Sequence, residues 1–177
     1  MYQGRLDIND HIDLSRTQST IPHMIIQNYR DVVPRQDDNG QLFKVLVDQG
    51  VCLDTLVDGR SRSLAHIIVE EKYDLKLLSC LLKQESSLIH SVDNDGRTIV
   101  HTAVEDNDPH LLTFLLREEP SLINKRYDDD RSLVRIVVEK ESLIMLGALF
   151  IGCPGLVDSI NNGDRELIQG ALASRKP

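Results

Sequence analysis

A periodicity of about 34 residues is the feature that most constrains the fold of this chain of 177 residues. Three sets of residues recur with it: the hydroxyl residues Ser63, Thr98 and Ser132, the pairs Leu81-Leu82, Leu115-Leu116 and Leu149-Phe150, and the leucines Leu88, Leu122 and Leu156. The steps within each set are 34 or 35 residues. A short unit that cannot bury its apolar face alone stacks on similar units, which produces such a period. The sequence therefore predicts a solenoid of stacked repeats.

Each repeated unit contains two predicted helix starts. Residues suited to cap a helix stand before apolar stretches at Ser63, Thr98 and Ser132, and again at Asp74, Asp108 and Ser142. A side-chain oxygen at such a position accepts a hydrogen bond from a backbone N–H group that the helix leaves unpaired. The sequence has no sustained alternation of apolar and polar residues, the pattern typical of strands. We therefore predict an all-α fold with two helices in each unit.

The same spacing predicts the domain boundaries. Asn39 lies 35 residues before Asp74, which indicates an earlier unit that begins near Thr20. We expect residues 1–19 to form a poorly ordered N-terminal tail and residues 20–177 to form the repeat domain. Its predicted units are 20–57, 58–92, 93–127 and 128–162, followed by a C-terminal half-unit at 163–177.

One stretch carries a resemblance to a known family. Residues 93–103, DNDGRTIVHTA, resemble the signature D-x-x-G-x-T-P-L-H-x-A of the ankyrin repeat family. Gly96 permits a positive φ in the turn, Thr98 can cap the first helix, and the His101 ring is placed to bond a neighbouring loop. The signature lacks its proline at Ile99, and Arg135 replaces the histidine in the next unit. The resemblance implies an ankyrin-type helical solenoid that binds other proteins through its concave face.

Composition excludes several classes of partner. The formal net charge of −8 opposes binding to phosphate backbones, and the densest basic run is confined to residues 174–176, so we expect no nucleic-acid partner. Three widely spaced cysteines favour a reducing compartment. No stretch approaches the roughly 18 apolar residues of a membrane span. We predict a cytoplasmic protein without membrane contact, while the nucleus and delivery into a host cell stay open.

Catalytic and metal-binding motifs receive little support. His66 and His101 occupy equivalent positions in their units, which favours a structural hydrogen-bonding role over metal ligation. The acidic stretch 93–96 lacks the glutamate of a calcium loop, because Thr102 stands at that position. Phosphate-binding loops and nucleophile motifs are missing from the sequence. We therefore predict a protein that is not an enzyme and has no cofactor and no metal site.

Arginine and glutamate recur in the same period and form what we call the Arg–Glu pairs. Each glutamate follows its arginine by eight residues, and the pairs are Arg62 with Glu70, Arg97 with Glu105, and Arg131 with Glu139. Either these charges keep a surface soluble, or the surface that they line contacts a partner. For the second interpretation the predicted partner-binding residues are Arg62, Asn94, Asp95, Arg97, Glu105, Asp106, Asp128, Asp129, Arg131 and Glu139.

Stacked repeats offer an extended concave surface, which suits recognition of another protein better than catalysis in a deep cleft. We predict a protein–protein interaction module that binds an intracellular protein as an inhibitor, a scaffold or a pathogen effector. An alternative is that the chain is the substrate-targeting fragment of a larger enzyme or adaptor. A third is weak homo-oligomerisation through the end repeats. The sequence itself names no partner.

Overall fold

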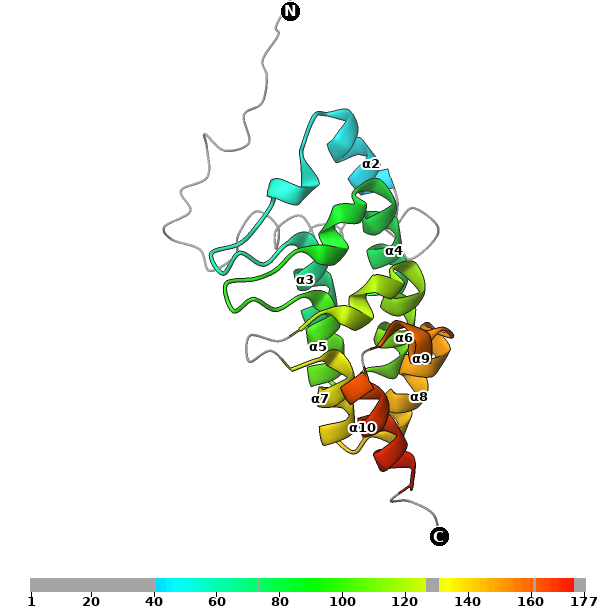
Figure 1. The fold of residues 1–177 in the computed structure, drawn as a ribbon. Helices are drawn as coiled ribbons and strands as arrows, with labels where there is room; N and C mark the ends of the chain where they lie inside the picture. Colours follow the sequence, from blue (N-terminus) through cyan, green and yellow to red (C-terminus); the bar gives the residue numbers. More distant parts are fainter. Residues whose placement is uncertain (1–40, 73, 127–130, 161, 174–177) are drawn as a thin grey trace, which may run out of the picture.

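Helices joined by loops make up the part of the chain that the computed structural model describes (Figure 1). The described residues are 41–72, 74–126, 131–160 and 162–173. Within these ranges there is no β-strand, and only two isolated antiparallel bridges join Val57 to Ser63 and Arg126 to Ser132. The prediction of an all-α fold is confirmed for these residues. None of the helices in the described ranges combines the length and apolar character needed to cross a bilayer.

Most of the helices lie in two rows (Figure 1). The first row contains three helices of seven residues, α3 (Leu64–Glu70), α5 (Ile99–Glu105) and α7 (Leu133–Glu139). The second row contains three helices of ten residues, α4 (Leu75–Gln84), α6 (Pro109–Glu118) and α8 (Leu143–Gly152). Helix α2 (Gln41–Asp48) contacts α4 at one end, and α10 (Asn162–Ala173) contacts α7 at the other. Short helical turns link the second row to the next unit: η1 (Leu53–Thr55), η2 (Ser86–His90), η3 (Pro120–Asn124) and α9 (Leu156–Ser159).

The predicted capping residues stand where the helices begin. In the second row the Asp74 carboxylate accepts a hydrogen bond from the Lys76 N–H at 2.9 Å, and Asp108 accepts from His110 and Leu111 at 3.0 Å each. In the first row Ser63, Thr98 and Ser132 are the N-caps of their helices. These contacts satisfy N–H groups that the first turn leaves without a helical partner. The predicted helix starts are therefore confirmed.

The connection between the two helices of each unit also repeats. Lys72, Asn107 and Glu141 occupy equivalent positions, and their φ angles are 55°, 55° and 52°. A single left-handed residue ends the first helix and redirects the chain toward the second. The unit therefore repeats in backbone conformation as well as in sequence.

The apolar core runs between the two rows. Leu81, Leu115 and Leu149, predicted from their period, are fully buried in the second row. Another buried series extends the period by one unit, since Leu53 is 1% exposed and Leu88, Leu122 and Leu156 are 0% exposed. These four leucines lie in the short helical turns that link the units, namely η1, η2, η3 and α9, respectively. The turns therefore help to close the core between successive units.

The two ends of the predicted array differ from its middle units. The predicted tail at 1–19 and the predicted cap Asn39 lie outside the described residues, so the first unit is represented from α2 onward. At the C-terminal end α10 occupies the position of a first-row helix beside α7. It has 12 residues, whereas α3, α5 and α7 have seven. The half-unit therefore ends in a longer helix than the period indicates.

Candidate protein-binding surface

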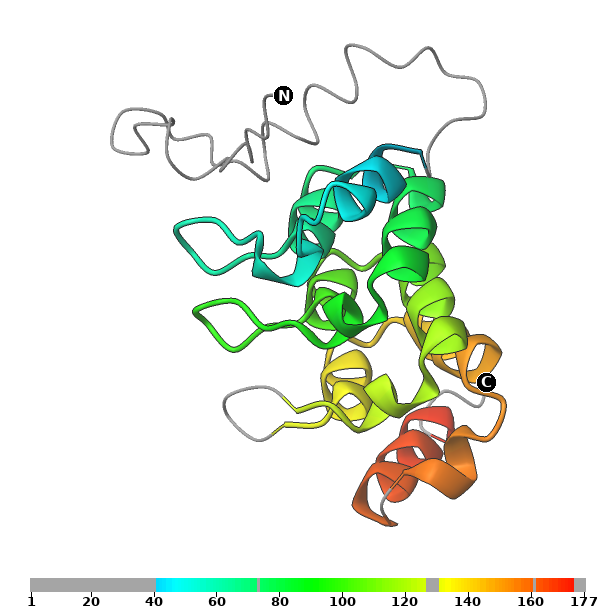
Figure 2. The same cartoon turned by 90° about the horizontal axis from the view of Figure 1, so that it is seen from above.

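Loops project from the ends of the first-row helices toward one side of the molecule (Figure 2). The two that are fully described, residues 57–63 and 92–98, are called the hairpin loops here. A third loop leaves the helices between Arg126 and Ser132, but its tip at 127–130 lies outside the described residues. The Asn94 N–H donates a hydrogen bond to the Arg60 carbonyl oxygen at 2.9 Å. The two hairpin loops are therefore linked to each other near their tips.

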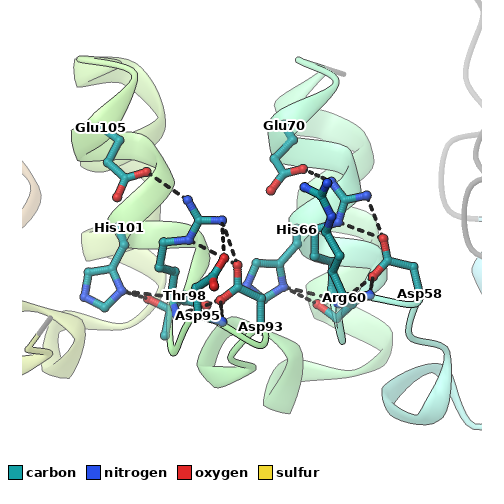
Figure 3. A network of polar contacts seen from close by, with 12 residues as sticks. Asp58, Arg60, His66, Glu70, Asp93, Asp95, Thr98, His101 and Glu105 are labelled. Atoms are coloured by element: carbon teal, nitrogen blue, oxygen red, sulfur yellow. Dashed lines mark hydrogen bonds and ion pairs between the residues drawn. The ribbon is translucent and has the colours of Figure 1, made fainter. Parts of the chain in front are cut away.

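A buried carboxylate organises each hairpin loop. In the second loop one oxygen of Asp93 accepts hydrogen bonds from the backbone N–H groups of Asp95 and Arg97, at 2.9 and 2.8 Å. The side chain of Asp93 is 3% exposed. Asp58 holds the first loop in the same way, with two backbone N–H groups at 2.8 and 2.9 Å. Each loop is thus folded around an aspartate, as Figure 3 shows.

An arginine connects each hairpin loop to the far end of the next helix. The Arg97 guanidinium lies 3.0 Å from Asp93 and 3.4 Å from Glu105, the last residue of α5. Arg62 makes the corresponding contacts, at 2.6 Å with Asp58 and also with Glu70 at the end of α3 (Figure 3). In two of the predicted Arg–Glu pairs the arginine therefore contacts its glutamate, and the aspartate of the same hairpin loop is its second partner.

Electrostatics keep these loop contacts ionised. Burial alone would raise the pKa of Asp93, but hydrogen bonds from the backbone and side chain of Arg97 outweigh it and hold the pKa below its usual 3.8. Burial alone would lower the pKa of Arg97, whereas the hydrogen bond to Asp93 raises it above its usual value. Asp58 and Arg62 shift in the same directions for the same reasons. The acid–base pair in each loop is therefore charged at neutral pH.

The third Arg–Glu pair has a different setting. Arg131 lies 2.7 Å from Glu139, and Arg135, which replaces the signature histidine, lies 2.9 Å from the same carboxylate. Hydrogen bonds from Arg135 and Arg131 lower the pKa of Glu139. The hydroxyl of Ser132 donates to the buried Asp164 at 2.6 Å. The fourth unit is therefore tied to α10 by a hydroxyl–carboxylate contact at the position of the first-row cap.

A buried histidine, His66, connects its unit to the next one. The Nδ1 atom of His66 accepts from the Ser63 backbone N–H at 3.3 Å, so the ring proton is on Nε2 and is donated to the Arg97 carbonyl oxygen at 3.0 Å. That carbonyl lies in the hairpin loop of the next unit. The Nδ1 atom of His101 accepts from the Thr98 N–H at 3.0 Å. The structural role predicted for the histidines is confirmed for His66, and the predicted bond of His101 to a neighbouring loop stays a prediction.

Unfolding is expected to become easier in mild acid because of His66. Burial lowers the pKa of His66 below its usual 6.5, against the opposing effects of the Arg97 carbonyl and of nearby carboxylates. As pH falls below about 6.5, the unfolded chain binds a proton that the folded chain resists, so stability present above this pH is lost through the folded-state pKa. Urea unfolding between about pH 8 and pH 5 should show this decline. Asp58 and Asp93 do not titrate in that window, since their pKa values lie below 3.8.

His66→Gln provides the control for this pH dependence. The variant removes the titrating ring, so its free energy of unfolding should change less between the same two pH values than that of the wild type. An equal slope in the variant and the wild type would show that another group is responsible.

The predicted partner-binding residues fall into three groups. Asn94, Asp95, Glu105, Asp106 and Glu139 are exposed, whereas Arg62, Arg97 and Arg131 are partly buried, and Asp128 and Asp129 lie outside the described residues. The geometry brings Arg97 together with Asp95 and Glu105, and Arg131 together with Glu139. Asp106 lies 3.8 Å from Lys72 of the preceding unit. A role for this set in partner binding stays a prediction.

Sequence reasoning missed the two aspartates that organise the hairpin loops. Asp58 and Asp93 were not among the predicted site residues, although each precedes an arginine of the Arg–Glu pairs by four residues. That repeated spacing, 35 residues apart, was the available signal.

Among the described residues, no three His, Cys, Asp or Glu side chains are grouped in a way that could hold a metal ion.

Comparisons of the chain with protein-family models, with curated proteins and with solved structures give no match. The function of the chain is therefore inferred from its own geometry.

Proposed function

We propose that this chain is an ankyrin-type helical repeat solenoid that binds an intracellular protein through its hairpin loops and the adjacent ends of its first-row helices. The observation that carries the proposal is the pair of hairpin loops, which project side by side and are fixed by buried aspartates (Figures 2 and 3). Under this proposal, the side on which they project is the concave face that the ankyrin resemblance implies. Toward this partner the chain acts as an inhibitor, a scaffold or an effector.

Pre-organisation of the loops supports this assignment. Ordering flexible loops on binding costs free energy, so loops fixed in advance leave more of the contact energy for affinity. Asp93 fixes the backbone of its loop, and the bond from Asn94 to Arg60 fixes one loop against the next. The side chain of Asp95 at the tip is 73% exposed. The loops therefore combine a rigid backbone with side chains that face solvent.

The charged residues divide into two roles under this proposal. Arg62 and Arg97 contact the aspartate of their own loop and the glutamate at the end of the next helix, so they position the loops. The tip residues Asn94 and Asp95 make the contacts that differ from unit to unit. Exposed ion pairs contribute only about 0–1 kcal/mol to stability, so the exposed charges are better explained by recognition than by folding. Asp128 and Asp129, which lie outside the described residues, stay predicted members of this surface.

A charge exchange at the loop tips is expected to weaken partner capture. The variant Arg60→Glu with Asp95→Lys reverses two exposed tip charges and leaves the net charge unchanged. Since charge reversal at a binding interface places like charges together, we expect at least about a tenfold loss of affinity. Immobilised protein would be used for capture from a lysate of its native host, with captured proteins identified by mass spectrometry and their affinity for the wild type and variant measured.

The matched control reverses two exposed charges on the second row. Lys83→Glu with Glu118→Lys also conserves net charge, and these residues lie on α4 and α6. The control should capture the same protein as the wild type, and circular dichroism should show equal helical content in all three proteins. Equal capture by the tip variant and the wild type, or equal loss in the control, would place the site elsewhere.

A further inference from the structure

One stripe of α8 differs from the equivalent stripes of α4 and α6 at its first and last positions, which are exposed on all three helices, whereas the middle position of α6, Thr113, is half-buried against α8. The three equivalent positions hold Lys76, Ser79 and Lys83 on α4, His110, Thr113 and Arg117 on α6, and Ile144, Gly147 and Ile151 on α8. The two isoleucines remain 68% and 56% exposed, respectively. Apolar side chains therefore face solvent on α8 where the other helices carry basic ones.

Helix α8 is apolar around its whole circumference. Its sequence, LIMLGALFIG, contains no charged residue, and Leu143 adds a third large side chain that is 54% exposed. Helices of this kind are normally buried on all sides. We call the exposed part of this helix, formed by Leu143, Ile144, Gly147 and Ile151, the α8 face. Its composition indicates a surface that is covered in the assembled protein.

A pocket beside the α8 face continues the series of contacts between units. An equivalent pocket of about 120 Å³ is lined by α3 and α4 and is bordered by Leu111 and its neighbours from the next unit. The pocket beside α8 has about 350 Å³ and is lined by Val137, Val138, Leu143, Leu146 and Ala171. It lacks a second-row helix on its open side within the described residues. The next interface of the row is therefore half formed at this end.

The α8 face has the symmetry expected of a contact between two copies. Gly147 lies near the middle of the stripe, three residues after Ile144 and four before Ile151, and a Cβ atom added to it would have no heavy atom within 4 Å. Two antiparallel α8 helices that cross at Gly147 place Ile144 of each copy against Ile151 of the other. The same helix already approaches α6 closely through another glycine, Gly152. Small residues at a crossing let helix backbones come together.

Charge also favours a second copy at this place. Two copies of a chain with a net charge of −8 repel each other. The ten residues of α8 carry no charge, so two copies can approach there without bringing like charges together. Contact of one patch with itself closes after two copies and does not propagate.

We propose that two copies of this chain form a two-fold dimer through the α8 face, with the two α8 helices crossing at Gly147. The dimer covers the exposed isoleucines and borders the pocket between α7, α8 and α10. It leaves the hairpin loops free, because these project from the first row, whereas the α8 face belongs to the second. The proposal is thus independent of the partner-binding function, and either can fail without the other.

Sedimentation equilibrium over a range of concentrations tests the dimer. The wild type should approach twice its chain mass of 20.0 kDa. Ile144→Lys with Ile151→Arg restores the basic residues of the equivalent stripes and should give the chain mass at every concentration. Val45→Lys, at a position 52% exposed on α2, is the control and should remain dimeric. A wild type with the single-chain mass throughout, or a dimer that survives the double substitution, overturns the proposal.

Gly147→Leu distinguishes a specific crossing of the two α8 helices from non-specific hydrophobic association. The substitution keeps the face apolar but adds bulk where the helices cross, so the dissociation constant of the dimer should rise by about tenfold or more. Circular dichroism should confirm unchanged helical content in each variant. Association that is equal or stronger in Gly147→Leu, or a mass beyond two chains for the wild type, contradicts a two-fold contact at Gly147.

Discussion

Replacing Asp93 by alanine is expected to lower the free energy of unfolding by about 2–4 kcal/mol, because it removes the acceptor around which a hairpin loop is folded. The two N–H groups that Asp93 accepts from, at 2.9 and 2.8 Å, lose their partner. The guanidinium of Arg97 loses its nearest carboxylate as well. Arg97 is 36% exposed, so water screens part of this last loss. Urea unfolding at neutral pH measures the change.

Asp95→Ala is the matched control for Asp93→Ala. The two aspartates are two residues apart and have the same charge, but the Asp95 side chain is 73% exposed and its contact with Arg97 is 3.4 Å long. A change at an exposed site of this kind stays within about 0.5 kcal/mol. Asp58→Ala should resemble Asp93→Ala, since Asp58 makes the same contacts in its own loop. Similar losses at Asp93 and Asp95 would mean that the buried carboxylate does not organise the loop.

The importance of Asp93 was hard to predict, whereas the helices were not. Helix starts depend on contacts within three or four residues, so Asp74 and Asp108 could be identified as caps from the sequence. The core leucines follow from a period that repeats several times. Asp93 was identifiable as the first residue of the signature-like stretch, but its role depends on a chain reversal that brings the Arg97 backbone back to its carboxylate. Such a reversal is a property of the folded loop.

The role of the arginines shows the same limit. Their period was evident, but a long side chain has several carboxylates within reach, and the sequence does not choose among them. The structure places Arg97 between Asp93 and Glu105, which gives the recurrence of arginine and glutamate a folding explanation. The tip residue Asp95 has only a long contact of this kind. Folding and recognition can therefore be assigned to different residues of one loop, which the two interpretations of the Arg–Glu pairs did not separate.

Contacts between helices were the least predictable part. Helix α10 has 12 residues, whereas the period gives only its position. The close approach of α6 and α8 depends on Gly152, which occupies the position of Gln84 and Glu118 in the other units. A glycine at the end of a helix is common as a terminator, so its packing role is not evident from sequence. The contact between Gly152 and α6 can be tested by substitution.

Gly152→Ala is expected to lower the free energy of unfolding by about 1–3 kcal/mol, although alanine is the better helix former. A Cβ atom at position 152 would lie 2.8 Å from the Cβ of Leu116 and 3.3 Å from the Cα of Thr113. Neither atom is at the free end of a flexible side chain, so α6 and α8 must separate. Separation weakens packing around Leu116 and Ala148, which are 0% and 3% exposed.

Gly147→Ala on the same helix should have the opposite sign. An added Cβ at position 147 has no neighbour within 4 Å, so only the helix propensity acts, and the free energy of unfolding should rise by about 0.5–1 kcal/mol. Both variants would be unfolded with urea at the lowest practicable protein concentration, where any self-association contributes least to apparent stability. The pair shares residue type, helix and substitution, and differs in what the new methyl group meets. Stabilisation by both variants would show that α6 and α8 yield at no cost and that Gly152 is not required for their approach.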